Sequence, residues 1–169
     1  MIVDGCSAMY DKNVMHRDLK LANILIHFPQ YDDPSQEDML EMDLETVDFC
    51  VKIADLGYAR ELTKAATGRT LSFKGSPLMM APEQLGRYFD RGSGYNHKID
   101  VWAMGVIFYQ FLTGVFMFDA DPRLQVQGKN ALMLNLLNNV EAGTWSWPTD
   151  ISISLGSFDF LNKTMHHLP

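Results

Sequence analysis

An uncharged stretch of eighteen residues, Val101–Phe118, most constrains how this chain can fold. It reads VWAMGVIFYQFLTGVFMF, and acids stand at its two ends, at Asp100 and Asp119. A segment this apolar must leave water, either by crossing a membrane or by forming the buried centre of a domain. Gln110, Thr113 and two glycines interrupt it, which disfavours the membrane. We therefore expect a long buried helix that starts near Asp100, and no membrane span.

The composition is that of an ordinary globular protein. The chain has 169 residues, of which 47% are hydrophobic and 21% charged, so it can bury one core. Its net charge of −7 comes from one segment, Tyr31–Asp48, which holds eight acids and no Lys or Arg. The rest of the chain is nearly neutral, which argues against nucleic acid or a membrane surface as a partner. The two cysteines, Cys6 and Cys50, lie among apolar neighbours and indicate reduced thiols in a cytoplasmic protein.

The spacing of apolar residues predicts a mainly helical fold with a small β-hairpin. Short apolar runs indicate two strands, Ile24–Ile26 and Val51–Ile53. Pro82 stands where a helix commonly begins, and Gly143 is a plausible helix terminator. Helical spacing predicts three further helices: Met1–Tyr10, 132–140 and Phe158–Met165.

The acidic segment lies between the two predicted strands. Pro34, the high charge and the length favour a mobile surface insertion at about residues 29–50, with a hint of helix near Met39. Such an insertion is a solvated loop or a docking site for a basic partner, and both interpretations stay open.

Polar residues with a shared chemistry follow the first helix. HRDLKLAN, at residues 16–23, has no helical or strand periodicity and reads as a loop. Asp18 can accept a proton or orient a hydroxyl, and Lys20 can neutralise a phosphate oxygen. Asn23 and Asp55 offer the hard oxygen ligands that Mg²⁺ prefers. Phosphoryl transfer from a nucleotide requires this set of groups.

Four motifs then carry a family resemblance. HRDLKLAN, DLG at 55–57, APE at 81–83 and DVWAMG at 100–105 resemble the ordered signature of eukaryotic protein kinases. The resemblance covers the chain apart from the acidic insertion. It implies the C-terminal lobe of a kinase fold, mainly α, with the hairpin beside the two loops. GSPLMMAPE and KIADLGYAR further resemble the autophagy-initiating kinases.

The resemblance implies a role for each matched residue of the site. Asp18 would be the catalytic base or would position the acceptor hydroxyl, and Lys20 would contact the transferred phosphate. Asn23 and Asp55 would hold Mg²⁺, while Leu25 would lie under the adenine ring of ATP. A Lys two residues after the Asp is the serine/threonine pattern, so the implied reaction transfers the γ-phosphate of ATP to Ser or Thr of a protein substrate.

Structural roles are implied in the same way. His16 and Leu56 would belong to an apolar spine anchored on Asp100. Glu83 would be a buried carboxylate that pairs with an arginine beyond the last predicted helix.

The resemblance also implies control by phosphorylation. In kinases that carry an arginine before the catalytic Asp, as at Arg17, activity usually depends on a phosphate in the activation loop. Here that phosphate would lie on Ser72, with Arg60 as a second cation. Thr67 and Thr70 are rival sites.

Substrate preference is partly implied. Kinases that select arginine before the target often place acids where this chain has Ala22 and Gln110. We therefore expect no strong basic preference through those positions. Phe73, Pro77 and Met80 would line the pocket for the residue after the target, which suggests an apolar residue there.

Some parts of a complete kinase are not recognisable in the sequence. No Gly-rich loop, strand lysine or partner glutamate precedes the first helix. We therefore expect residues 1–169 to be a partial kinase domain whose N-terminal lobe is absent, and the chain alone to be inactive. The alternative is a non-catalytic binding or decoy module derived from a kinase lobe. The undamaged set of polar residues at the site favours the first interpretation.

Overall fold

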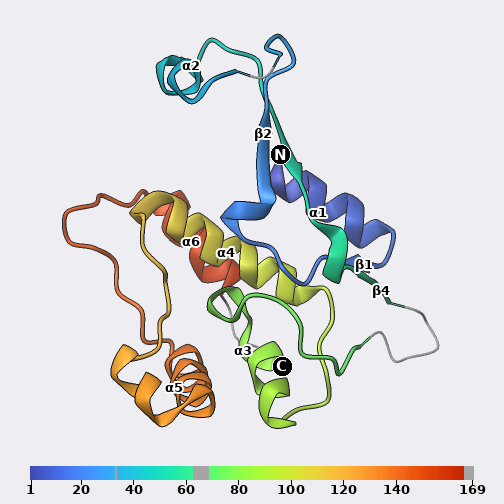
Figure 1. The fold of residues 1–169 in the computed structure, drawn as a ribbon, viewed down its shortest axis with the longest axis vertical. Helices are drawn as coiled ribbons and strands as arrows, with labels where there is room; N and C mark the ends of the chain where they lie inside the picture. The colour runs from blue at the N-terminus through green and yellow to red at the C-terminus, as the bar shows by residue number, and fades with distance from the viewer. Residues whose placement is uncertain (33, 63–68, 166–169) are drawn as a thin grey trace.

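The computed structural model describes residues 1–32, 34–62 and 69–165 and is organised around helix α4, Lys98–Thr113 (Figure 1). Helix α4 is apolar on all sides, and its central residues are buried, as a helix at the centre of a domain requires. The most deeply buried side chains are contributed by several elements: Met15, Leu19, Leu85, Tyr95, Ile99, Val106, Leu137 and Leu161. The expectation of a long buried helix near Asp100 is confirmed.

The uncharged run is not helical over its whole length. Helix α4 ends at Thr113, because Gly114 adopts a left-handed conformation with φ of 74° and caps the helix. The chain then turns, and Phe118 stacks on Trp102 of the same helix with ring centroids 5.9 Å apart. Within the described residues, no helix has the length and apolarity needed to cross a bilayer.

Two short antiparallel pairs make up the β-structure. Strand β2, Ile24–His27, pairs with β3, Cys50–Ile53, so that Ile24 faces Ile53 and His27 faces Cys50. This is the predicted hairpin. A second pair, which the sequence did not indicate, joins β1, Val14–Met15, to β4, Arg60–Glu61.

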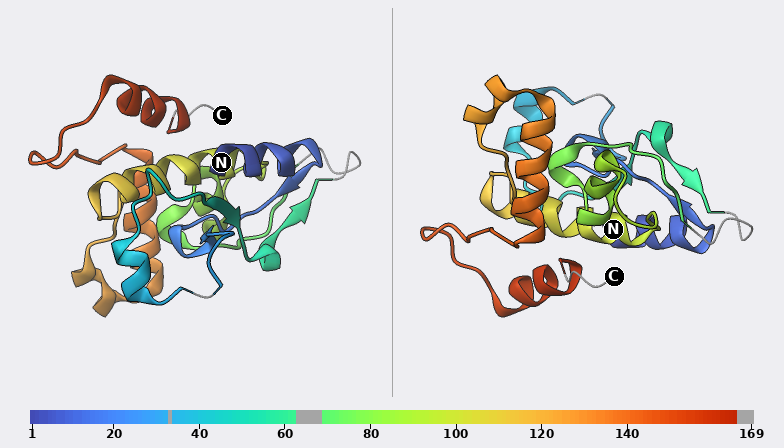
Figure 2. Two further views of the ribbon diagram at one scale, coloured as in Figure 1. Left: turned by 90° about the horizontal axis from the view of Figure 1, so that it is seen from above. Right: turned by 90° about the horizontal axis from the view of Figure 1, so that it is seen from below.

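The other helices pack around α4. Helix α1, Ile2–Asp11, contacts both β3 and α4, while α5, Lys129–Glu141, packs on α3, Pro82–Gly86. Helix α6, Leu155–Thr164, packs along α4 (Figure 2). Short 3₁₀ turns connect these elements: η1 (Leu21–Asn23), η2 (Leu56–Tyr58), η4 (Pro77–Met79), η5 (Arg87–Phe89) and η6 (Pro122–Gln127).

Two of the predicted helix signals are confirmed. Pro82 is the first residue of α3, where its missing N–H is not needed. Gly143, with φ of 61°, follows the end of α5 and donates its N–H to the Val140 carbonyl.

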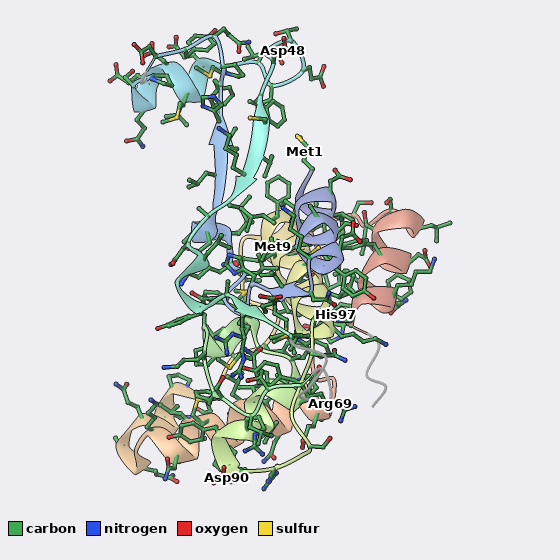
Figure 3. The ribbon with its side chains drawn as sticks, turned by 90° about the vertical axis from the view of Figure 1, so that its right-hand side faces the viewer. Met1, Met9, Asp48, Arg69, Asp90 and His97 are labelled. Carbon is green, nitrogen blue, oxygen red and sulfur yellow. The ribbon has the colours of Figure 1, made fainter. Side chains whose placement is uncertain are left out.

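The acidic insertion, residues 28–49 with Asp33 outside the described part, extends from the far end of the hairpin and is called the arm below. It carries helix α2, Gln36–Glu41, at the end of the molecule opposite α3 (Figure 1). Asp48 of the arm and Asp90, which follows η5, lie at opposite ends of the structure (Figure 3). Most described residues of the insertion are exposed.

Candidate functional site

The HRDLKLAN loop is fixed to the central helix by one buried carboxylate. Asp100, in the first turn of α4, accepts the backbone N–H of His16 at 2.8 Å and that of Arg17 at 3.0 Å. Burial raises the pKa of Asp100, and these two N–H groups oppose the rise. The loop therefore depends on an acid 83 residues away from Arg17 along the chain.

His16 connects this loop to the DLG segment. It is fully buried; its Nδ1 accepts the Asp18 N–H at 3.3 Å, and its Nε2 lies 2.9 Å from the Ala54 carbonyl oxygen. A carbonyl oxygen only accepts and a backbone N–H only donates, so the two contacts match the tautomer that carries its proton on Nε2. The ring thus sets the spacing between Asp18 and the residue that precedes Asp55.

Asp18 is held by two donors. Its side chain is 5% exposed; Lys20 Nζ donates to Oδ2 at 2.8 Å and the Ser76 hydroxyl donates to Oδ1 at 2.7 Å. Lys20 Nζ also lies 3.3 Å from the Ser76 oxygen, so the three groups form a closed triangle. The triangle fixes the direction of the carboxylate and leaves a lone pair on each oxygen for a further donor.

The electrostatics keep Asp18 ionised. Burial alone would raise its pKa, but the hydrogen bonds from Lys20 and then Ser76 outweigh burial, and the net pKa is lowered. The same hydrogen bond, which Lys20 donates to Asp18, raises the pKa of Lys20. At neutral pH the pair is therefore a carboxylate that accepts hydrogen bonds beside an ammonium group.

Asn23 and Asp55 meet at the same end of the β2–β3 hairpin. Asn23 immediately precedes β2, and its carbonyl accepts the Ala54 N–H at 2.9 Å. Its side-chain Nδ2 donates to the Asp18 carbonyl at 2.9 Å, which directs its Oδ1 away from that bond. Asp55 follows Ala54 in a left-handed conformation, with φ of 61°, and its exposed carboxylate accepts only the Gly57 N–H at 3.2 Å among the described residues.

These two side chains fit a magnesium ion. Both retain an oxygen that is free of protein partners among the described residues, and oxygen is the ligand type Mg²⁺ takes. The described residues contain no group of three His, Cys, Asp or Glu that could hold a metal by themselves. Protein sites commonly bind Mg²⁺ through one or two side chains together with phosphate oxygens and water.

The predicted regulatory residues also come together. Arg17 Nη1 donates to the Ser72 hydroxyl at 2.7 Å, and Arg60 Nη1 donates to the Thr70 hydroxyl at 2.8 Å. Ser72 and Thr70 hydroxyl oxygens lie 3.2 Å apart. Thr70 is only 2% exposed and pairs through its backbone with Tyr95, whereas Ser72 is half-buried. The rival Thr67 lies outside the described residues.

Leu25, expected under the adenine ring, and Leu56, expected in an apolar spine, are both exposed. Leu25 on β2 is 50% exposed and Leu56 on η2 is 59% exposed. Leu56 was expected in an apolar spine with His16, and in the described structure it is not part of one. The left-handed Asp55 turns the chain into η2, whose residues are all exposed.

The three residues expected to line one substrate pocket lie in different environments. Pro77 lines a largely apolar cavity of about 300 Å³, together with Lys20, Ala22, Gln110 and Phe116. Met80 is buried in the core, and Phe73 packs edge-on against Tyr88 with ring centroids 5.2 Å apart. In the described structure only Pro77 of the three lines this cavity.

Glu83 is not the buried carboxylate that the sequence suggested. It is exposed and lines a cavity of about 520 Å³ with Arg69, Arg91 and Lys98. Among the described residues no cation lies within ion-pair distance of it. At the first turn of a five-residue helix its side chain points to solvent, while the next residue, Gln84, is buried.

Two site residues were missed by the sequence reasoning. Ser76 bonds Asp18, and Gln84 donates its Nε2 to the Lys74 carbonyl at 2.7 Å and lies 3.4 Å from the Arg17 carbonyl. Their positions directly before Pro77 and after APE were the available signal. Both tie the segment after residue 70 to the HRDLKLAN loop.

The comparisons with known proteins agree with these motifs. The family model described as "Protein kinase domain" matches residues 1–169. The DNA damage response protein kinase DUN1 of Saccharomyces cerevisiae is 35% identical over 113 residues, which are 67% of this chain and 21% of that protein. The serine/threonine-protein kinase ATG1b of Arabidopsis thaliana is 34% identical over 166 residues, or 98% of this chain and 19% of that protein.

A third relative has the same character. The human serine/threonine-protein kinase D2 is 31% identical over 161 residues, which are 93% of this chain and 14% of that protein. The chain thus spans between 14% and 21% of the length of these relatives. Because the identities are so similar, they indicate the family without separating its branches.

Proposed function

The chain belongs to the protein kinase family, and we propose that it forms the substrate-side half of the active site of a serine/threonine kinase. The observation that carries the proposal is the Asp18 carboxylate, held by Lys20 and Ser76 beside Asn23 and Asp55. The lobe assignment, the residue roles and the activity of the whole product are part of this proposal.

Asp18 acts by positioning the acceptor hydroxyl. A carboxylate whose pKa lies below its ordinary value is too weak a base to remove a proton completely from a serine hydroxyl. It can accept the hydroxyl hydrogen bond and so direct the oxygen towards the phosphorus, which is the alignment that phosphoryl transfer needs. Lys20, 2.8 Å away, neutralises negative charge that develops beside the acceptor.

Asn23 and Asp55 would hold Mg²⁺, and Leu25 would lie against the nucleotide base. When bound, magnesium and ATP supply the phosphoryl group and screen its charge. The chain's own contribution is to present the free Asn23 oxygen and the Asp55 carboxylate at one end of a hydrogen-bonded hairpin. The fixed strand register keeps those two groups next to each other.

We further propose that a second lobe covers this face. Leu25 on β2 and Leu56 on η2 are exposed beside the site, although large apolar side chains usually gain from burial. An N-terminal lobe packed there would cover them and would exclude water from the phosphates. We therefore expect residues 1–169 alone to bind substrate surfaces without turning over ATP.

The acceptor side favours apolar neighbours. Ala22 and Gln110 line the cavity beside Lys20 and Ser76, and none of the described residues that line it is an acid. A peptide with apolar residues around its target serine therefore fits better than one with arginines.

The test is a phosphotransfer assay on the native product. An antibody against the arm isolates the protein as the cell makes it, and labelled ATP with a serine peptide of apolar flanks reports turnover. We expect phosphoserine, dependent on Mg²⁺, and a loss of about 100-fold or more in Asp18→Asn. Equal turnover by Asp18→Asn would contradict the proposal.

A matched control uses Asp90→Asn, an exposed acid that pairs with Arg87 rather than with the groups around Asp18. It should leave turnover unchanged. The 169-residue chain, assayed beside the native product, should show none.

A further inference from the structure

The arm is a folded element with its own small core. Phe28 at its base is buried, with its ring centroid 6.3 Å from that of Tyr31 and 6.2 Å from that of Phe49. The N-terminus of helix α2 is capped by a capping box. The Asp38 N–H donates to the Ser35 hydroxyl, and the Ser35 N–H donates to the Asp38 carboxylate. The arm therefore presents a defined surface rather than a solvated coil.

This surface is apolar where a soluble arm would be polar. Leu40 of α2 is 79% exposed, and Met39 and Leu44 beside it are also exposed. These three large apolar side chains, within six residues of the chain, are called the patch. The arm that carries them projects from the body (Figure 3). Such a patch, surrounded by polar groups, is typical of a protein-binding surface.

The charge around the patch determines what can cover it. Tyr31–Asp48 contains eight acids and no Lys or Arg. Among the described residues, none of these acids forms an ion pair. A partner that brings cations relieves their mutual repulsion, and one that also brings apolar side chains covers Leu40.

We propose that the arm docks a lysine- and arginine-rich amphipathic segment of another protein. The apolar face of that segment covers Met39, Leu40 and Leu44, and its cations face Glu37 and Glu41. The docking site goes beyond the proposed phosphotransfer, because it uses none of the residues around Asp18. The arm extends from the end of the β2–β3 pairing opposite to Asn23 (Figure 1), so a docked segment would lie away from the proposed site.

The test measures binding by the 169-residue chain itself, so it does not depend on kinase activity. The probe is a labelled peptide of about eighteen residues, made of Leu and Lys with Leu at helical i, i+3, i+4 spacing. A scrambled peptide of the same composition, with no apolar face, is the control. We expect a micromolar Kd for the amphipathic probe and binding about tenfold weaker for the scrambled one.

Two arm variants separate the apolar contribution from the charge. Leu40→Ser keeps the charge and should weaken binding about tenfold. Glu37→Gln with Glu41→Gln leaves the Ser35–Asp38 cap intact, and should weaken binding several-fold and flatten its salt dependence. Val126→Ser, at a side chain on η6 that is 92% exposed, is the matched control and should bind like wild type.

Three results would overturn the proposal. The scrambled peptide could bind as tightly as the amphipathic one, or Leu40→Ser could bind like wild type while circular dichroism shows it folded. Met39→Ser replaces Leu40→Ser in this test if the latter does not fold. Self-association of the chain that Leu40→Ser abolishes would assign the patch to a second copy instead.

Discussion

The guanidinium of Arg17 lies 2.7 Å from the hydroxyl of Ser72, although 55 residues separate the two in the chain. Arg17 also donates its Nε to the Tyr58 carbonyl at 2.5 Å, and its own N–H bonds Asp100. The cation is thus anchored between the DLG segment and the core before any phosphate is present. A phosphate on Ser72 would meet an arginine that is already in place.

Phosphorylation of Ser72 should therefore stabilise the chain. The phosphate adds nearly two negative charges and three acceptor oxygens beside Arg17, and we expect the unfolding midpoint to rise by about 3 °C. Thermal unfolding of the phosphorylated and unmodified chains measures this difference. The same phosphate in Arg17→Gln should have little effect on the unfolding midpoint. An equal rise in that variant would show that Arg17 does not bind the phosphate. In the native product, Ser72→Ala should lower turnover strongly.

Removing the Ser76 hydroxyl should raise the pKa of Asp18. Burial favours the neutral acid, and the bonds from Lys20 and Ser76 oppose it, so Ser76→Ala shifts the balance upwards. The ¹³C resonance of the Asp18 carboxyl, followed against pH, reports the shift. Ser93→Ala, a serine that bonds Arg69 instead, is the control and should leave the Asp18 pKa unchanged.

The same carboxylate gives a pH dependence of stability. Because the folded pKa of Asp18 lies below its ordinary value of 3.8, the contribution of its ionised form is complete above that value. The contribution is lost as the pH falls through the folded pKa. The free energy of unfolding of wild type, minus that of Asp18→Asn, should therefore decrease on acidification below about pH 4. If this difference in the free energy of unfolding instead increases on acidification, the prediction is wrong.

Gly75 should tolerate no side chain. Its φ is +114°, and a Cβ there would lie 2.2 Å from the Arg17 carbonyl oxygen. Gly75→Ala should lower the free energy of unfolding by about 2–4 kcal/mol, since strain and backbone overlap add. Gly92, with φ of +77° and open space around it, supplies the matched control. Gly92→Ala should cost only the strain, about 1 kcal/mol, and similar losses in both variants would exclude the overlap as the cause.

Gly105 sets the distance between α4 and α6. A Cβ at Gly105 would lie 2.3 Å from Thr164 Oγ1 and 2.8 Å from Met165 Sδ. Gly105→Ala should destabilise the chain by about 1–3 kcal/mol, measured by urea unfolding, as expected for overpacking a core. Thr164→Ala should partly restore stability in the double variant. If the effects of the two substitutions on the free energy of unfolding are simply additive, overlap with Thr164 is not the cause of the destabilisation by Gly105→Ala.

Local signals in the sequence predicted the elements well. The apolar runs at Ile24–Ile26 and Val51–Ile53, the proline at the start of α3 and the buried helix after Asp100 all appear in the structure. Each depends on neighbouring residues or on simple periodicity. The end of α4 at Thr113 was missed because Gly114 was counted as part of an apolar run rather than as a helix cap.

Side-chain partners were harder to predict because they depend on distant segments. Ser76 reaches Asp18 across 58 residues, and its place directly before Pro77 was the only local signal, which does not name Asp18 as the partner. Glu83 and Leu56 were assigned buried positions from the family pattern, but the described chain leaves both in solvent. Burial is a property of everything that packs on a residue, so a motif cannot establish it alone.

The ladder between β2 and β3 separates the arm from the site by four paired positions, from His27↔Cys50 to Ile24↔Ile53. The pairing fixes Asn23 relative to Asp55 whatever length of chain connects the far ends of the strands. Lengthening that connection twofold costs only about 0.6 kcal/mol in loop-closure entropy. The hairpin thus makes the arm an interchangeable module, in which sequence can be gained, lost or grafted while the groups beside Asp18 stay where they are.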